Sequence, residues 1–550
     1  MSLRLLATVA STLLCAQVTK LLVQWVSKQL YSPLREMPGP PSPSLLFGNF
    51  GKLSFRLFQR WQAQYGPTFR YHAIFRSHHL FTADAVALHH IVNNPDVYEK
   101  GEMVRYALTQ LLGRGLLALE GDEHTKLRKI MSPAFGPSQI RGLTELFLDK
   151  SIELRDVWTR SPADPTGWIP VDVFEGLKRM TLDVIGLAGF AYEFHALKES
   201  TDEQEKRSPL EVAFREFFMD RQGEGVGIDL RIVLRAMFPL LRAIVPPHPK
   251  MLAERKTMDK VGLQLLQEAK TAIVSGDKDS ERRDLLSLLV QSNISEQESH
   301  RVSDQDVVAQ LPTFFAAGHE TTSTATSWAL YALARAPDIQ EKLRAELTSM
   351  GTDSPSLDAL NGLPYLEKFV REVMRVYGPV AFTNRVATRD DIIPLGTPYT
   401  DTRGVKHDSV SVKKGQFVRV PVGAVNQDPR IWGEDAAEFN PDRWDSIPSA
   451  ASEIPGVGYA HLFTFLGGPH NCIGWRFAIA ETKALVYTLV RGFEFALALD
   501  EGDGEEVQIR ESVGAIRRPE VVKRKVSGSW KPWKGYEATE AQLPMRVRRI

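Results

Sequence analysis

The sequence predicts a mainly α-helical protein with a smaller β region. From Trp61 onwards, long stretches carry apolar residues at helical spacing, and short strand-like runs such as residues 68–71 lie between them. The length would allow about three or four average domains. However, no linker-like change in composition divides the chain after residue 60 or so. We therefore expect one large domain, residues 46–550, with two short segments before it.

The composition is that of an ordinary globular protein, with 43% hydrophobic residues and 67 basic side chains against 67 acidic ones. A net charge of zero argues against nucleic acid as the main partner. The two cysteines, Cys15 and Cys472, are too far apart in sequence to staple the fold, and a zinc site needs about three or four ligands at short spacing. If Cys472 binds a metal, it is the sole cysteine ligand, which favours a haem thiolate over an iron–sulfur cluster.

Residues 1–30 are a candidate membrane anchor. The stretch 5–26 is mostly apolar and would measure about 33 Å as a helix, close to a hydrocarbon core of about 30 Å. A cleaved secretory signal is the alternative, because Arg4 precedes a short apolar run with small residues near Ala16. We favour a retained anchor, followed by a stiff proline-rich hinge at residues 31–45.

Cys472 lies in a glycine-rich loop, residues 465–474, which reads FLGGPHNCIG. The pattern that follows is helical, so the sulfur should lie at a helix N-terminus, where a thiolate is favoured. Gly467, Gly468 and Gly474 allow positive φ and a close approach of the backbone to something flat or bulky. The alternative is a small buried core thiol, which is the ordinary role of a lone cysteine.

A long helix is predicted over residues 303–335. Small residues at 316–318 leave a groove in its middle, and the polar residues 320–322 line that groove. Thr321 can donate a hydrogen bond to the carbonyl one turn earlier and bend the helix, while Pro312 should kink it before the groove. Such a notch can hold a small ligand, although a plain helix crossing explains the same residues.

Glu372 and Arg375 lie three residues apart in another helical run, residues 365–375. This spacing is common, and residues 341–344 contain it as well. The first pair differs in its context, because it leads to Arg385 and then to residues 439–444 shortly before the cysteine loop. One carboxylate shared by two buried guanidinium groups would explain the set, since unpaired buried charges are costly.

Two further features have ordinary alternatives. His124 and Arg128 lie one turn apart in a helix predicted at residues 121–133, a pair that on its own would be a solvated face. Residues 228–245 carry arginines on an apolar stretch that could dip into a bilayer surface, and core packing explains them equally well.

Together, these motifs make the chain resemble a cytochrome P450, a haem-thiolate monooxygenase, over nearly its whole length. Four signatures occur in the family's order and spacing. They are the groove at 317–322, Glu372-x-x-Arg375, Pro441-x-Arg443 and the cysteine loop at 465–474. The overall style also resembles fungal microsomal members. The resemblance implies the cytochrome P450 fold with an N-terminal membrane anchor helix.

The resemblance also implies roles for the residues that match. Cys472 would be the axial ligand of the iron in haem b, with Thr321 and Glu320 on the opposite face to steady dioxygen and deliver protons. A structural triad would hold the cysteine loop; its members would be Glu372, Arg375 and Arg443.

Haem contacts are implied as well, with two departures from the family pattern. The matching residues are Phe465, Gly468, His470, Arg128, His124 and Arg385. The family usually has Arg where His470 stands and Trp where His124 stands, each reaching a haem propionate. Histidine is fully cationic only below a pKa of about 6.5, so Arg128 and Arg385 should sustain propionate binding.

The implied reaction inserts one oxygen atom from O2 into a hydrophobic small molecule, such as a terpenoid, another secondary metabolite or a different lipophilic compound. Electrons would come from NADPH through a separate cytochrome P450 reductase, with cytochrome b5 as an optional donor, because nothing in the chain resembles a flavin or dinucleotide domain. The expected location is the endoplasmic reticulum membrane, with the catalytic domain in the cytosol. The expected substrate pocket comprises Phe314, Phe315, Ala317, Val380 and Phe382.

Two alternatives to this function remain: an oxygen-independent haem-thiolate isomerase or dehydratase, and a catalytically silent membrane-bound haem protein. The isomerase would not need Thr321 or Glu320, so their presence favours the monooxygenase. A basic docking surface for the reductase is expected on the cysteine side, with scattered solvated charges as the alternative; its candidates are Lys126, Lys129, Arg476 and Lys483.

Overall fold

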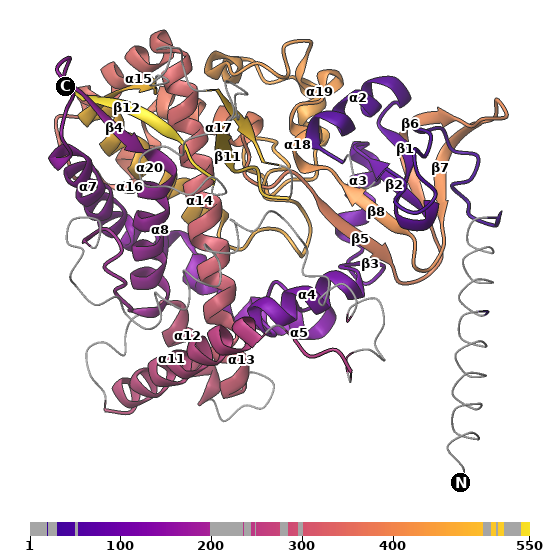
Figure 1. Ribbon diagram of the computed structural model, residues 1–550, viewed down its shortest axis with the longest axis horizontal. Helices are drawn as coiled ribbons and strands as arrows, with labels where there is room; N and C mark the ends of the chain where they lie inside the picture. The colour runs from indigo at the N-terminus through magenta and orange to yellow at the C-terminus, as the bar shows by residue number, and fades with distance from the viewer. Residues whose placement is uncertain are drawn as a thin grey trace, which may run out of the picture.

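The structure is a computed structural model that describes residues 31–49, 53–198, 249–275, 284–294, 301–498, 508–512, 515–521 and 541–550, with further positions at 19, 30, 235, 242 and 244–247 (Figure 1). Its α-helices are α2 (Phe55–Tyr65), α3 (Ala85–Asn93), α4 (Glu102–Leu112), α5 (Gly121–Met131), α6 (Pro137–Gly142), α7 (Thr144–Arg160), α8 (Val173–Phe190), α11 (Pro249–Val274), α12 (Leu285–Asn293), α13 (Asp304–Val308), α14 (Gln310–Arg335), α15 (Pro337–Ser349), α16 (Leu357–Asn361), α17 (Pro364–Val376), α18 (Val422–Asn426), α19 (Pro429–Trp432) and α20 (Trp475–Gly492). Short 3-10 helices are η2 (Ile74–Arg76), η3 (Ser132–Phe135), η9 (Pro441–Asp445) and η10 (Ser449–Glu453).

The strands form a smaller part of the fold, which confirms the predicted class. They are β1 (Thr68–His72), β2 (His78–Thr82), β3 (Tyr98–Glu99), β4 (Trp168–Asp172), β5 (Thr383–Ala387), β6 (Asp391–Thr400), β7 (Lys406–Val412), β8 (Phe417–Val420), β9 (Phe493–Leu497), β10 (Ile509–Glu511), β11 (Pro519–Val521) and β12 (Pro544–Arg549). Within the described ranges, the largest sheet has the order β1-β2-β8-β5-β3, and β12 pairs between β4 and β9. In Figure 1 the largest sheet lies to the right of α14, whereas α7, α8 and α20 lie to its left.

The long central helix is divided near its start, as the proline predicted. α13 ends at Val308 and α14 begins at Gln310, so the expected continuous helix over 303–335 is interrupted at Ala309. Pro312 has no N–H to donate to the carbonyl of Val308, and this missing bond accounts for the break.

Gly318 serves helix packing rather than the predicted groove. A Cβ on Gly318 would lie 2.8 Å from Cγ1 of Ile185 on α8, which is closer than carbon atoms pack. The glycine therefore allows α8 to approach α14, and a hydrogen bond from Thr181 Oγ1 to the carbonyl of His319, 3.0 Å long, joins the two helices next to it.

A continuous hydrophobic core runs from the first described segment to the last strand. It includes Leu34 and Met37 near the start and Val547 near the end. The N–H of Arg70 in β1 donates to the carbonyl of Pro38 at 3.0 Å, so residues 34–38 pack against the body. This part of the predicted hinge is therefore not a free spacer, because its apolar side chains are buried.

Two sequence predictions concern segments outside the described residues. These are the membrane anchor at 1–30, apart from positions 19 and 30, and most of the arginine-bearing stretch at 228–245. Within the described ranges, every helix is too short or too polar to cross a lipid bilayer.

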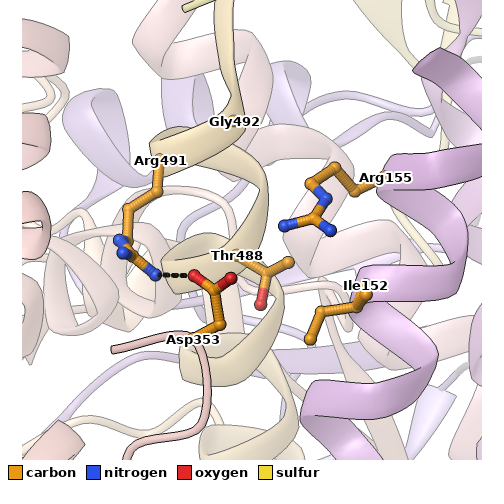
Figure 2. A pocket seen from close by; sticks show the side chains of 6 residues that line it. All are labelled: Ile152, Arg155, Asp353, Thr488, Arg491 and Gly492. Carbon is orange, nitrogen blue, oxygen red and sulfur yellow. Dashed lines mark hydrogen bonds and ion pairs between the residues drawn. The ribbon is translucent and has the colours of Figure 1, made fainter. Parts of the chain in front are cut away.

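A small pocket of about 90 Å³ lies between α7 and the end of α20 (Figure 2). Arg491 donates to Asp353 Oδ1 at 2.6 Å, and Arg155 pairs with Asp156 Oδ1 at 3.0 Å. Carboxylates therefore balance both guanidinium groups that line the pocket. None of the predicted site residues lines this pocket, so the candidate site lies elsewhere.

Candidate functional site

The glycines of the cysteine loop are required by close backbone contacts. A Cβ on Gly467 would lie 1.6 Å from the carbonyl oxygen of Pro455, and one on Gly468 would lie 2.0 Å from that of Val92. Gly468 also has a positive φ of 66°, as predicted. Gly474 does not, since its φ is −92°, and a Cβ there would meet only ordinary contacts with Phe135.

The thiol of Cys472 is exposed, although its neighbours in the loop and in α20 belong to the core. Its N–H donates to the carbonyl of Phe465 at 2.9 Å, which closes the loop. Burial by surrounding protein raises the pKa of the Cys472 thiol, whereas the N–H of Gly474 and the charge of Arg128 lower it. The exposed residue leaves its sulfur available as a ligand.

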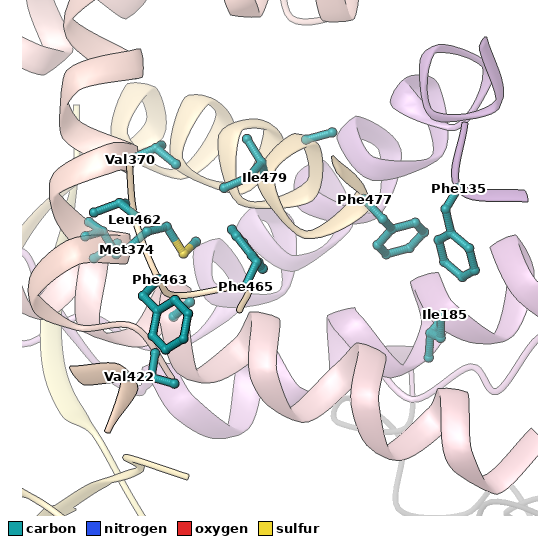
Figure 3. Packing of buried hydrophobic residues seen from close by; sticks show 14 of the residues in the cluster. Phe135, Ile185, Val370, Met374, Val422, Leu462, Phe463, Phe465, Phe477 and Ile479 are labelled. Atoms are coloured by element: carbon teal, nitrogen blue, oxygen red, sulfur yellow. The ribbon is translucent and has the colours of Figure 1, made fainter. Parts of the chain in front are cut away.

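Phe465 anchors the loop to the core, as Figure 3 shows. Its side chain is buried, and Met374, Leu462 and Phe463 gather beside it below Ile479 of α20. Burial of such large apolar side chains fixes the position of the loop. The predicted packing of Phe465 against a haem is compatible with this place, since the loop carries Cys472 at its other end.

The middle of α14 carries the predicted notch. Ala317 is exposed, although the helix on either side of the notch is mostly buried. Thr321 Oγ1 donates to the carbonyl of Ala317 at 2.6 Å, as predicted. Glu320 pairs with Arg518, a residue in the loop before β11 that the sequence analysis did not identify. The notch therefore combines a small residue, a hydroxyl and an ion-paired carboxylate.

Four of the five predicted pocket residues have other contacts. Phe315 is 1% exposed and packs against the rings of Phe190 and Phe194, so it belongs to the core because α8 covers it. Phe314 stacks on Phe135 at 5.6 Å. The remaining two lie at the loop before β5: Val380 pairs with Ile516, and the ring of Phe382 lies 3.9 Å from the guanidinium of Arg419.

The predicted charged triad is present and buried. Both carboxylate oxygens of Glu372 accept bonds from Arg375, at 2.8 and 2.9 Å, and both side chains are 0% exposed. Arg443 Nε lies 3.6 Å from Glu372 Oε1. Asp435, which the sequence analysis missed, accepts the strongest contacts from Arg443, at 2.6 and 2.8 Å.

The triad reaches the cysteine loop through two residues that the sequence did not indicate. Arg375 donates to the carbonyl of Asn426, and Asn426 Nδ2 donates to Thr464 Oγ1 at 2.7 Å. Asn426 Oδ1 also accepts the N–H of Phe463 at 2.9 Å. The buried ion pair is therefore linked, through Asn426, to the segment that leads into Phe465.

Positive side chains gather on one side of the loop. Arg128 donates to the carbonyl and to Oδ1 of Asn471, at 2.7 and 2.5 Å. Lys100 Nζ lies 2.6 Å from Glu120 Oε1, and Arg385 is 7% exposed without a carboxylate partner among the described residues. Three cations face one carboxylate in this cluster, which leaves a surplus of two positive charges.

His124 and His470, the two histidines that differ from the family pattern, lie together in this cluster. The ring centroids of His124 and His470 are 4.0 Å apart. Burial, together with the neighbouring positive charges, lowers the pKa of His124 to about 4 and that of His470 to about 2. Both rings are therefore neutral at neutral pH, and Nδ1 of His124 is buried without a hydrogen-bond partner among the described residues. They can donate hydrogen bonds to an anion but do not add charge.

These residues fit a haem. Two propionates would neutralise the surplus of two positive charges around Arg128, Arg385 and Lys100, and they would give the unpaired histidine atom a partner. The exposed thiol supplies one axial ligand. No zinc-type set of several cysteines competes for that sulfur, because the chain has two cysteines in all.

The predicted docking surface is partly wrong. Lys483 is 2% exposed and pairs with Glu367, 2.5 Å away, because it lies on the inner face of α20. Lys129 and Arg476 are exposed, as expected. Arg476 lies over the ring of Trp475 at 4.1 Å, at the start of the helix that follows the cysteine loop.

Comparisons with known proteins agree with this geometry. The family model for cytochrome P450 matches residues 38–523. Cytochrome P450 monooxygenase 128 of Postia placenta is 45% identical over 516 residues, which cover 91% of this chain and 92% of that protein. Cytochrome P450 monooxygenase claP of Ampulloclitocybe clavipes is 34% identical over 550 residues, covering 97% and 96%. The chain therefore belongs to the cytochrome P450 family and is a monooxygenase, an oxidoreductase with mostly helical structure.

Proposed function

We propose that the protein holds haem b through Cys472 and inserts one atom of O2 into a lipophilic small molecule, with electrons from NADPH through a separate reductase. The observation that carries this proposal is a pair of open positions in otherwise buried helical surroundings. One is the thiol before α20, and the other is Ala317 beside the Thr321 hydroxyl in α14.

Phe135 lies between the Cys472 side and the Ala317 side of the site. Its ring stacks on Phe314 of α14, and it lies 3.7 Å from where a Cβ would stand on Gly474. The thiol side and the notch side thus belong to one site. The stacked rings of Phe135 and Phe314 place apolar surface beside it, which supports a lipophilic substrate such as a terpenoid or another secondary metabolite.

Residues of the protein set the chemical environment on both sides of this site. When bound, haem supplies an iron that activates O2, and a thiolate ligand donates electron density that favours O–O cleavage. On the thiol side, burial raises the pKa of Cys472, and the Gly474 N–H and the Arg128 charge partly oppose this rise. On the notch side, Thr321 donates its proton to the carbonyl of Ala317, so its oxygen is free to accept a hydrogen bond.

Glu320 is the proton carrier in this proposal. Its ion pair with Arg518 keeps the carboxylate beside the notch. Release from Arg518 would allow Glu320 to take up a proton from water and pass it towards Thr321. This acid and alcohol pair has no use in an oxygen-independent isomerase, which is why we favour oxygenation.

The test is reconstitution with an NADPH-dependent reductase under isotopically labelled dioxygen, with profiling of lipophilic products. We expect one labelled oxygen atom per oxidised product. Conversion of a substrate without label, or without NADPH, would instead identify an isomerase or dehydratase. Haem binding without any turnover would identify a silent haem protein.

Replacing Thr321 with alanine should divert electrons to hydrogen peroxide while haem binding stays intact. Removal of a single positioned hydroxyl at a reacting centre should reduce product formed per NADPH by about tenfold or more. Peroxide and product are measured in the same reconstituted reaction. Thr324→Val is a matched control, because Thr324 is a buried threonine on the same helix. Equal coupling in wild type and Thr321→Ala would remove the role of Thr321.

A groove of about 390 Å³ beside the start of α20 supports docking of the electron donor. Trp475 and the exposed Arg476 line it, and apart from the buried Lys483 its lining has three cations against two carboxylates: Arg141, Arg371 and Arg476 against Asp358 and Glu367. We propose that an acidic face of the reductase, and of cytochrome b5 as an optional donor, binds there.

We also propose attachment to the endoplasmic reticulum membrane through residues 1–30, with the catalytic domain in the cytosol. Exposed apolar side chains support this location: Leu45 is 72%, Leu46 57% and Phe47 62% exposed. Phe75 lies next to them, because its N–H donates to the carbonyl of Leu46 at 2.7 Å. Such a patch beside an anchor can rest on lipid.

Deletion of residues 1–30 should move the protein from the membrane pellet to the supernatant after high-speed centrifugation, with its haem spectrum unchanged. The cut at residue 30 spares the buried Leu34 and Met37. Secretion of the full-length chain with cleavage near Ala16 would contradict the anchor and favour a signal peptide.

A further inference from the structure

Glu481 is a buried acid that none of the roles above uses. It lies on α20 and is 0% exposed. Neither of its carboxyl oxygens has a well-formed hydrogen bond within the part of the chain that the structure describes. The polar group that acts on it is the hydroxyl of Thr322 on α14, which is itself 2% exposed.

This environment favours the neutral form of Glu481. Burial raises its pKa well above the ordinary value, and the Thr322 hydroxyl opposes that shift only in part. An isolated carboxylate inside a protein is far more costly than a neutral acid, because no cation compensates its charge. The neutral acid carries an O–H that still needs an acceptor, and Thr322 can provide one.

The contact joins the two walls of the candidate site. α20 begins at Trp475, three residues after Cys472, and Thr322 directly follows Thr321. Adjacent residues on a helix are rotated by about 100°, so Thr322 can face α20 while Thr321 faces the notch. A bond that fixes Thr322 against α20 therefore also fixes the direction of the Thr321 hydroxyl.

We propose that protonated Glu481 is a positioning residue, which donates its O–H to Thr322 Oγ1 and thereby holds Thr321 at the correct angle for dioxygen. This role depends on the proposed function of Thr321. It requires no proton transfer by Glu481, which would need a path to solvent that a fully buried side chain lacks. Its requirement is a neutral donor of the right length at position 481.

The substitutions follow from that requirement. Glu481→Gln keeps the length and a neutral N–H donor, whereas Glu481→Met keeps the length without a donor. Thr322→Val keeps the shape of the acceptor residue without its oxygen. Thr482→Val is the matched control, because Thr482 is the next residue on α20, is 0% exposed and has an Oγ1 with no partner among the described residues. Thr321→Ala is the reference for a lost hydroxyl at the notch.

The main measurement is the rate of reoxidation of the reduced haem protein after rapid mixing with air-saturated buffer, which needs neither a substrate nor a reductase. Loss of one hydrogen bond should accelerate reoxidation by about 3- to 10-fold in Glu481→Met and Thr322→Val, in the same direction as Thr321→Ala. Glu481→Gln and Thr482→Val should stay within about twofold of wild type. The carbon monoxide difference band confirms that each variant holds haem through the thiolate.

Infrared spectroscopy tests the contact without any reaction. The wild type should show the carbonyl band of a protonated carboxylic acid at neutral pH. Glu481→Gln should remove this band, and Thr322→Val should shift it, because the O–H of the acid loses its acceptor. A band that survives in Glu481→Gln, or that Thr322→Val leaves unmoved, would overturn the proposed contact.

The combined outcomes separate this inference from the proposed function. If Thr321→Ala reoxidises fast and Glu481→Met does not, the positioning role is overturned and the function of Thr321 stands. If Glu481→Gln is as fast as Glu481→Met, the acid itself is needed, and positioning by a neutral donor is overturned. If Thr321→Ala behaves as wild type, the proposed function of Thr321 fails, and the role of Glu481 fails with it.

Discussion

Replacement of Cys472 by serine should abolish the carbon monoxide difference band of thiolate ligation. A serine hydroxyl does not ionise in the accessible pH range, so it cannot supply the charged sulfur that the site requires. The loop should survive, because the N–H at position 472 still bonds to the carbonyl of Phe465 and the glycine contacts are unchanged. We therefore expect a folded protein that has lost both the band and NADPH-dependent oxygenation, by about a thousandfold or more.

Cys15→Ser is the matched control, since it removes the other cysteine of the chain and should leave the band unchanged. Circular dichroism separates loss of ligation from loss of folding in both variants. Persistence of the band in Cys472→Ser would mean that another group binds the iron. Loss of the band in Cys15→Ser would show that the assignment of the sole cysteine ligand is wrong.

The sequence was most informative where local chemistry restricts the choice of residue. Gly468 has the positive φ that its position in the cysteine loop predicted. Pro312 interrupts the central helix because proline has no backbone N–H to donate in any sequence context. The hydrogen bond from Thr321 to Ala317 spans one helical turn and was predictable for the same reason. Each of these features depends on a few neighbouring residues.

Contacts between distant segments could not be predicted in this way. Asn426 and Thr464 connect the buried ion pair to the cysteine loop, yet neither residue type signals such a role, and 38 positions separate them. Asp435 and Arg518 are ordinary charged residues until the fold places them beside Arg443 and Glu320. A periodic pattern shows which residues of an element face inward, but it does not show what they meet.

Two errors have the same origin. Lys483 was expected on a docking surface because lysine is usually exposed, but the fold turns it inward to Glu367. Phe315 was expected in an apolar substrate pocket, but its ring meets Phe190 at the end of α8 and Phe194 just after it. The side of a helix that faces a cavity rather than a neighbouring helix is decided by tertiary packing.

The largest expected loss of stability comes from Glu372→Ala. This change leaves the guanidinium of Arg375, which is 0% exposed, without its carboxylate, and it also removes the acceptors of the Asn440 N–H and the Trp444 Nε1–H. Breaking a buried pair in this way costs about 3–5 kcal/mol. That loss is comparable with the whole stability of many domains, so little folded holoprotein should accumulate.

The chain contains its own control for this experiment. Glu341 and Arg344 have the same spacing on α15, but Glu341 is exposed and Arg344 bonds instead to Gln340 and to carbonyls at 490 and 493. Glu341→Ala should therefore change the free energy of unfolding by no more than about 0.5 kcal/mol. The measurement is urea unfolding followed by circular dichroism, together with haem content per folded chain. If both alanine variants were equally stable, the buried charge would not hold the cysteine loop, because the spacing would then matter no more at 372 than it does at 341.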